Sequence, residues 1–135
     1  MNSTTKRFGG AALAFGLITA AARVYAQPAE PTVIPVQLTE FHYSPASIDL
    51  QQGHSYVLRV SNVGGVAHDL SAKAFFRTVT FAPGSADKVR DGDIEVPKGE
   101  TVDVAFATGK AGDYEMRCTH PLHAMFGMKG HVIVH

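Results

Sequence analysis

The sequence contains no tryptophan and only one cysteine, and aromatic residues make up 9% of its 135 residues. A single cysteine cannot form an intrachain disulfide, which excludes a disulfide-stapled framework. No cluster of lysine and arginine stands out, and the 12 basic and 12 acidic residues balance to a formal charge of zero. This balance argues against a nucleic-acid-binding protein. The hydrophobic content of 45% argues against a disordered chain.

Long uncharged runs are scarce, and the longest, residues 8–22, lies near the N-terminus. It follows Lys6 and Arg7 and precedes a small-residue pattern that ends at Ala26. A positive segment, an apolar core and a small-residue cleavage site are typical of a secretory signal peptide. We therefore interpret residues 1–26 as a signal peptide and expect a periplasmic or a secreted protein. The alternative is a membrane anchor, although this run is shorter than the ~20 residues that a span needs.

Cleavage after Ala26 would leave residues 27–135, which we expect to form a single domain. This part contains all 12 acidic residues but only nine of the 12 basic ones, so its formal charge is −3 with neutral histidines. A domain of about 109 residues buries well over half of its unfolded surface, which is enough for one core. An exported protein has no cytosolic reductant for a free thiol, so we expect Cys118 to have a function.

Short alternating segments separated by Gly/Pro turns fill most of the remaining chain. Over residues 54–62, for example, Tyr56 and Leu58 follow the period-2 pattern of a half-buried strand. Further strands are expected at residues 47–50, 94–96, 101–108, 113–118 and 130–135. The proline-rich residues 27–35 are expected to form a loose lead-in. Closely spaced strands without a helical period predict an all-β sandwich or barrel of seven or eight strands. The alternative is an α+β domain with a helix at residues 73–79.

The residues that carry chemistry gather near the C-terminus, between Cys118 and Met128. One thiol, two imidazoles and two thioethers occur within these eleven residues. Soft sulfur together with imidazole is the ligand set that suits copper. The alternation of the preceding segment directs Cys118 inward, and a four-residue gap lets His123 close a loop onto the same ion. A second gap of four residues separates His123 from Met128, which can return as a weak axial ligand. A structural zinc site is the alternative, although methionine is a poor zinc ligand.

The pattern Cys118-x4-His123-x4-Met128 resembles the C-terminal ligand loop of the cupredoxins, the small blue copper proteins. Its four-residue gap between cysteine and histidine is similar to that of azurin, auracyanin and rusticyanin, whereas the gap of plastocyanin is shorter. Upstream, Asn62 and then His68-Asp69-Leu70 resemble the segment that supplies the first ligand of the family. The resemblance covers most of residues 27–135 and implies a Greek-key β-sandwich with the copper at one end.

The same resemblance implies that the protein binds one copper ion, which alternates between Cu(I) and Cu(II), and it implies which residues are the ligands. His68, Cys118 and His123 would form a trigonal core, and Met128 would be a long axial ligand. Without the resemblance, Cys118 could also be a small buried hydrophobe, and His68 could be an ordinary surface residue on a turn.

The resemblance further implies a contact between the two segments that supply the ligands. In the family, the residue after the first histidine bonds to the residue after the cysteine, and these residues are Asp69 and Thr119 here. A carboxylate at one position and a hydroxyl with an amide at the other are suited to such a bond. Contacts of this kind fix the orientation of metal ligands and tune the metal.

The other histidines are not expected to bind this copper ion. His120 follows Cys118 by two residues, which would place it on the opposite side of the chain, so we expect it to be exposed. Met116 is expected to pack in the core. Four further histidines are expected to be solvated, although two of them together could form a second metal site: His42, His54, His131 and His135.

These features favour a one-electron carrier and not an enzyme. His123 is expected to reach the surface within an apolar rim of Leu122, Met125 and Phe126, where redox partners such as cytochromes, oxidases or reductases would dock transiently. Binding to nucleic acid and stable membrane insertion after cleavage are not expected, and we expect a monomer. The alternative function is copper handling or copper tolerance without electron shuttling, which the additional histidines and Met125 would support.

Two classes of copper enzyme fit the sequence poorly. Copper oxidases and nitrite reductases need two or more domains of this kind and additional His-x-His ligands. The binuclear centre of cytochrome oxidase needs two cysteine ligands, and this chain has one.

Overall fold

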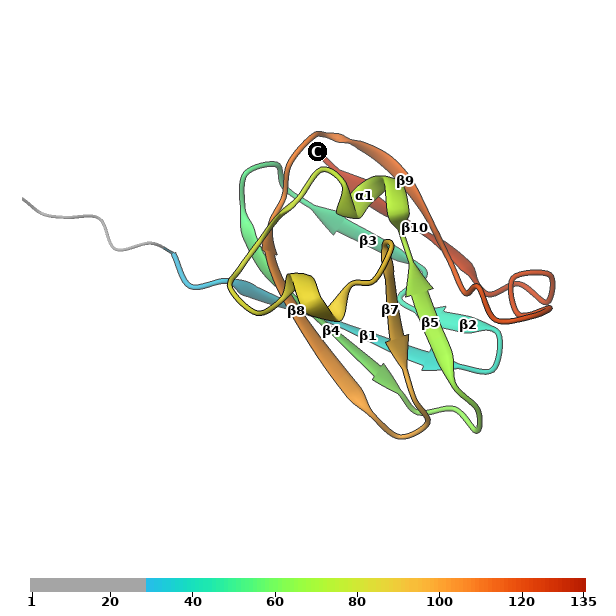
Figure 1. Ribbon diagram of the computed structural model, residues 1–135. Coiled ribbons are helices and arrows are strands. Elements are labelled where there is room, and N and C mark those ends of the chain that lie inside the picture. Colours follow the sequence, from blue (N-terminus) through green and yellow to red (C-terminus); the bar gives the residue numbers. More distant parts are fainter. Residues whose placement is uncertain (1–28) are drawn as a thin grey trace, which may run out of the picture.

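Two five-stranded β-sheets face each other in the computed structural model, which describes residues 29–135 (Figure 1). The strand order is β2-β1-β4-β8-β6 in the first sheet and β3-β10-β9-β5-β7 in the second. The predicted all-β sandwich is therefore confirmed. The signal peptide predicted for residues 1–26 lies outside the described residues.

The first sheet is antiparallel except where β1 runs parallel to β4. Its strands are β1 (Thr32–Thr39), β2 (His42–Ser44), β4 (Ser55–Asn62), β6 (Thr80–Phe81) and β8 (Thr101–Ala107). The loose lead-in expected for residues 27–35 is thus wrong from Thr32 onward. Pro35 is tolerated there because β2 pairs only with residues 37–39, so β1 has a neighbour on one side alone at Pro35.

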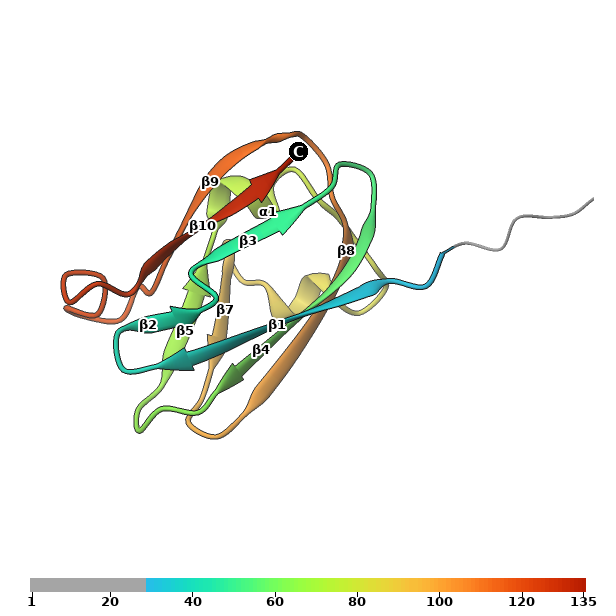
Figure 2. The same cartoon turned by 180° about the vertical axis from the view of Figure 1, so that it is seen from behind.

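The second sheet is antiparallel except where β10 runs parallel to β3. Its strands are β3 (Ser47–Leu50), β5 (His68–Ser71), β7 (Asp93–Val96), β9 (Gly112–Arg117) and β10 (Lys129–Val134). The chain crosses between the two sheets at both ends of the sandwich (Figure 2). These crossings bring segments that are far apart in sequence to the same end of the molecule.

The core lies between the sheets and follows the predicted alternation. In β4 every second residue is buried, beginning with Tyr56 and Leu58. Residues of the facing sheet, such as Leu50 and Val132, are buried as well. Burying an aliphatic or aromatic side chain of this size contributes about 1.5–3 kcal/mol each. The period-2 pattern therefore fixes which face of each strand turns inward.

Between β5 and β7 the chain forms a helix of only one turn, α1 (Lys73–Phe76), and, after β6, a 3-10 turn at Ala86–Lys88. Phe75 packs edge-on against Phe106 and Tyr114, with ring centroids 5.4 and 5.7 Å apart. The α+β alternative with a helix over residues 73–79 is therefore wrong. The described residues contain ten strands, not seven or eight, because several are only two to four residues long.

Three connections meet at one end of the sandwich. They are the β1–β2 turn, the segment before β5 and the long β9–β10 connection, which projects beyond the sheets in both views (Figures 1 and 2). No helix in the described part of the chain is long and apolar enough to cross a membrane. The predicted copper ligands lie on or beside two of these connections.

Candidate metal centre

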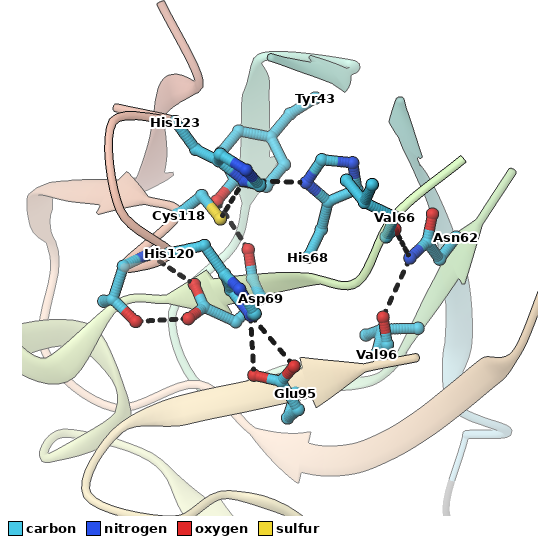
Figure 3. Close-up of polar contacts among 11 residues, drawn as sticks. Tyr43, Asn62, Val66, His68, Asp69, Glu95, Val96, Cys118, His120 and His123 are labelled. Atoms are coloured by element: carbon cyan, nitrogen blue, oxygen red, sulfur yellow. Dashed lines mark hydrogen bonds and ion pairs between the residues drawn. The ribbon is translucent and has the colours of Figure 1, made fainter. Parts of the chain in front are cut away.

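His68, Cys118 and His123 converge at this end of the sandwich (Figure 3). The Nδ1 atoms of His68 and His123 are 3.1 Å apart, and Sγ of Cys118 lies 3.4 Å from Nδ1 of His123. His68 opens β5, Cys118 directly follows β9, and His123 lies in the β9–β10 connection. The structure thus brings together three of the four residues for which a ligand role is predicted.

The three donor atoms suit a metal ion. A first-row metal ion bonds imidazole nitrogen and thiolate sulfur at about 2.0–2.3 Å. Donor atoms 3.1 and 3.4 Å apart are therefore within reach of one ion. One thiolate and two imidazoles are also the donor types that copper prefers.

Burial shifts the pKa values of two of these three side chains, His68 and Cys118. His68 is fully buried, Cys118 is nearly so, and His123 is half-buried. Burial lowers the pKa of His68, and the neighbouring His123 lowers it further, so the ring is held neutral with a lone pair for a metal. Burial raises the pKa of the Cys118 thiol. A metal ion that binds there displaces the thiol proton.

The β9 alternation places Cys118 on the inner side of the sheet, after the buried Met116. The connection beyond it closes back on itself through backbone hydrogen bonds. The N–H of Met128 donates to the carbonyl of His123 at 3.1 Å, and the N–H of Cys118 donates to the carbonyl of Met128 at 3.1 Å. Gly127 adopts a φ of 105°, a conformation that favours glycine.

Met128 closes this loop with a fully buried side chain. Its backbone hydrogen bonds to both Cys118 and His123 place it beside these two candidate ligands. Its role as axial ligand stays a prediction.

Asp69 and Thr119 join the two ligand segments across 50 positions of sequence. The Thr119 N–H donates to Oδ1 of Asp69 at 2.8 Å, and the Thr119 hydroxyl donates to Oδ2. Tyr43 on β2 adds a third contact, since its hydroxyl donates to the backbone carbonyl of Asp69 at 2.8 Å. Burial raises the pKa of Tyr43, which keeps this hydroxyl protonated. The expected contact between the residues after His68 and Cys118 is therefore present.

Asn62 orders the loop that leads to His68. Its side-chain amide donates to the carbonyls of Val66 at 2.8 Å and Val96 at 2.9 Å, while its Oδ1 accepts the N–H of Gly64 at 3.0 Å. Both N–H groups and the oxygen of this buried side-chain amide therefore form hydrogen bonds. Sequence reasoning placed Asn62 in the ligand segment but did not find this role.

His120 does not lie on the opposite side of the chain, and the expectation that it is exposed is wrong. Its side chain is 28% exposed, its ring stacks on His123 with centroids 5.4 Å apart, and its Nε2 lies 2.9 Å from a Glu95 carboxylate oxygen. A spacing of two residues puts side chains on the same face of an extended strand, not on opposite faces, and the strand itself ends at Arg117. His120 borders the site with its Nε2 turned toward Glu95.

A second group of potential metal ligands within residues 29–135 comprises Asp69, Glu95 and His120. Both carboxylate oxygens of Asp69 already accept hydrogen bonds from Thr119. The four remaining histidines belong to neither described group: His42, His54, His131 and His135. Two of these are exposed and pair with carboxylates, His131 with Asp113 and His135 with Asp49.

The β1–β2 turn lies beside both imidazoles, which sequence reasoning missed, and Oε1 of Glu40 is 4.0 Å from Nε2 of His68. Glu40 accepts a hydrogen bond from the Gly65 N–H, and this bond lowers the pKa of its carboxyl. The Phe41 ring meets His123 edge-on at a centroid distance of 5.2 Å. No local signal marks this turn, because Glu40 precedes His68 by 28 positions in the sequence.

A family model for copper binding proteins of the plastocyanin/azurin family matches residues 32–135. The chain therefore belongs to this family. Its cofactor is accordingly copper, as the donor set indicates. A curated relative, the copper-resistant cuproprotein CopI of Rubrivivax gelatinosus, is 27% identical over 115 residues, which cover 81% of this chain and 69% of the relative.

Solved structures share the fold at lower identity. The dithionite-reduced auracyanin of the photosynthetic bacterium Roseiflexus castenholzii matches with a TM-score of 0.57 and 18% identity over 79% of this chain and 99% of that chain. A multicopper oxidase of Campylobacter jejuni matches with a TM-score of 0.59 and 14% identity, over 83% of this chain but 32% of that chain. Both likenesses concern the fold alone.

Proposed function

We propose that the protein is a one-electron carrier that holds a single copper ion between His68, Cys118 and His123, with Met128 as a weak axial ligand. The observation that carries this proposal is the convergence of one thiol and two imidazoles at a single point. Copper bound there supplies a one-electron couple between Cu(I) and Cu(II). The role involves no bond-making reaction at a substrate, so the protein is not an enzyme on this proposal.

The candidate ligands suit this role because hydrogen bonds between protein groups hold the segments that carry them. The Asp69–Thr119 contact fixes the two ligand segments relative to each other, and such contacts orient ligands and limit their movement. Little rearrangement then accompanies a change in the charge of the site.

The surface around His123 suits transient docking of redox proteins. Leu122, Met125 and Phe126 are 58%, 77% and 59% exposed, and they flank the half-buried His123 in the same connection. A small exposed apolar patch beside a half-buried ligand is typical of a site for weak, short-lived complexes. We propose that partners such as cytochromes, oxidases or reductases dock here, and that residues 1–26 direct the protein to the periplasm.

Copper handling is the second candidate function, and the likeness to CopI favours it. In that case the protein would hold or deliver copper without passing electrons. The electron-carrier proposal predicts fast electron exchange between Cu(I) and Cu(II) molecules, because two copies can meet through the same patch. NMR line broadening in mixtures of the two forms measures this rate.

Substitution of Met125 by glutamate is expected to slow this self-exchange by on the order of tenfold or more, since like charges would then meet in the encounter complex. Val33→Glu is the matched control, because Val33 is also an exposed hydrophobe, 45% exposed, but lies near the start of β1. Equal rates for the two variants, or slow exchange in the unsubstituted protein with transfer of copper to a chelator, would favour the handling function instead.

A further inference from the structure

The outer nitrogen of His68 has no hydrogen-bond partner. The ring is fully buried and its Nδ1 faces His123, while its Nε2 is buried and unpaired. A buried polar group without a partner costs about 1–3 kcal/mol. A histidine that binds a metal through one nitrogen almost always donates its other N–H to a carboxylate, a carbonyl or a water. If Nδ1 of His68 binds a metal, its Nε2–H therefore needs a hydrogen-bond acceptor.

The carboxylate of Glu40 is the candidate acceptor for Nε2 of His68. Its Oε1 is 4.0 Å from Nε2 of His68 and also accepts the N–H of Gly65. A shift of the carboxylate by about 1 Å brings it within hydrogen-bond range. The Glu40 side chain is 47% exposed, so it has room for this shift.

Gly64 keeps the path between the two groups open. A Cβ atom at Gly64 would lie 2.8 Å from Oε1 of Glu40 and 3.1 Å from Nε2 of His68. Any side chain at this position would therefore push the carboxylate away from the imidazole. The sequence Gly64-Gly65 thus provides one N–H donor for Glu40 and the space for its second contact.

The turn that carries Glu40 is fixed against the ligand loop. Phe41 has a φ of 64°, a left-handed conformation that bulky residues rarely adopt and that costs about 1–3 kcal/mol. Its ring packs against His123 and against Phe126, with centroid distances of 5.2 and 5.1 Å. These contacts hold the strained turn, and with it the carboxylate, next to His68.

We propose that Glu40 is the positioning residue for His68: in the copper-loaded protein its carboxylate accepts a hydrogen bond from the Nε2–H and thereby favours Cu(II) over Cu(I). The proton on Nε2 leaves the Nδ1 lone pair for the metal. The negative charge behind the ring makes the imidazole a stronger donor, which stabilises the more highly charged ion. The inference rests on the proposed role of His68 as a copper ligand.

The test compares Glu40→Gln with Glu30→Gln. Glutamine at position 40 keeps an acceptor oxygen for Gly65 but removes the charge. Glu30 is an exposed glutamate ten positions earlier, at the opposite end of β1, and gives the same change in net charge. Reduction potentials come from redox titration of the copper-loaded proteins, and Cu(II) affinities come from chelator competition.

Glu40→Gln is expected to lose about tenfold in Cu(II) affinity relative to Cu(I) affinity, which for one electron raises the reduction potential by about 59 mV. Glu30→Gln is expected to leave both quantities unchanged. Long-range ¹H–¹⁵N spectra of the Cu(I) protein provide a second readout, in which His68 should carry its proton on Nε2.

Two results separate the possible failures. Equal potentials and Cu(II) affinities for Glu40→Gln and Glu30→Gln, in a protein that binds copper through Cys118, would overturn the role of Glu40 and leave the proposed function intact. A lack of thiolate-to-copper absorption in the unsubstituted protein would instead overturn the proposed function, and the inference with it.

Discussion

Replacement of Cys118 by alanine is expected to abolish the visible absorption of the copper-loaded protein while the β-sandwich stays folded. The chain has no other cysteine, so no second thiolate can donate charge to the metal. The side chain is small, although it is buried with 1% exposure, and its loss is expected to cost about 1 kcal/mol. Absorption spectra measured after addition of Cu(II), together with circular dichroism of the same samples, check both parts of the prediction.

Met116→Leu is the matched control for Cys118→Ala. Met116 is buried two positions earlier, in strand β9, which ends just before Cys118. Leucine conserves its volume, so the core should tolerate the change at a cost below about 1.5 kcal/mol. This variant should keep the full colour. An equally coloured Cys118→Ala protein would contradict the assignment of Cys118 as a ligand.

Replacement of Asp69 by alanine is expected to lower the free energy of unfolding of the copper-free protein by about 3–6 kcal/mol. The carboxylate accepts two hydrogen bonds from Thr119 while itself buried, and a hydrogen bond to a charged group contributes about 1.5–3 kcal/mol. The variant also leaves the Thr119 N–H without its acceptor. Urea denaturation followed by circular dichroism measures the change.

Asp69→Asn is the informative comparison, because the amide retains one acceptor oxygen for the Thr119 N–H and loses the charge. We expect a smaller loss of stability than for alanine. If Asp69→Ala changed the free energy of unfolding by less than about 1 kcal/mol, the contact would not hold the two ligand segments together, and the preformed site would need another explanation.

The sequence predicts the local part of the site well, for a physical reason. Cys118 and His123 lie on one short connection, so their spacing alone limits where they can meet. His68 lies 50 positions earlier than Cys118, and only the resemblance to a known family placed it beside them. The contacts of Glu40 and Phe41 could not be predicted, because they depend on how the β1–β2 turn docks against the ligand loop.

Two expectations were wrong, the first because a tertiary contact overrides a local pattern. The prolines of the first strand indicated a loose segment, but parallel pairing with β4 makes β1 a strand from Thr32. The expected position of His120 opposite Cys118 had a wrong premise, because residues two apart in an extended strand share a face. The chain instead turns after Cys118 and stacks His120 on His123. The pairing of β1 with β4 and the stacking of His120 on His123 both depend on neighbours that are distant in sequence or on a loop shape that the local pattern does not show.

A titration of the purified protein with Cu(II), followed by optical and EPR spectroscopy, tests the central claim most directly. The account predicts saturation at one copper per chain, with an intense thiolate-to-copper band that grows in proportion to the bound metal and disappears on reduction. Copper that binds without this band, or a band that survives removal of the imidazole at position 68 or 123 unchanged, would contradict a site built from these three side chains.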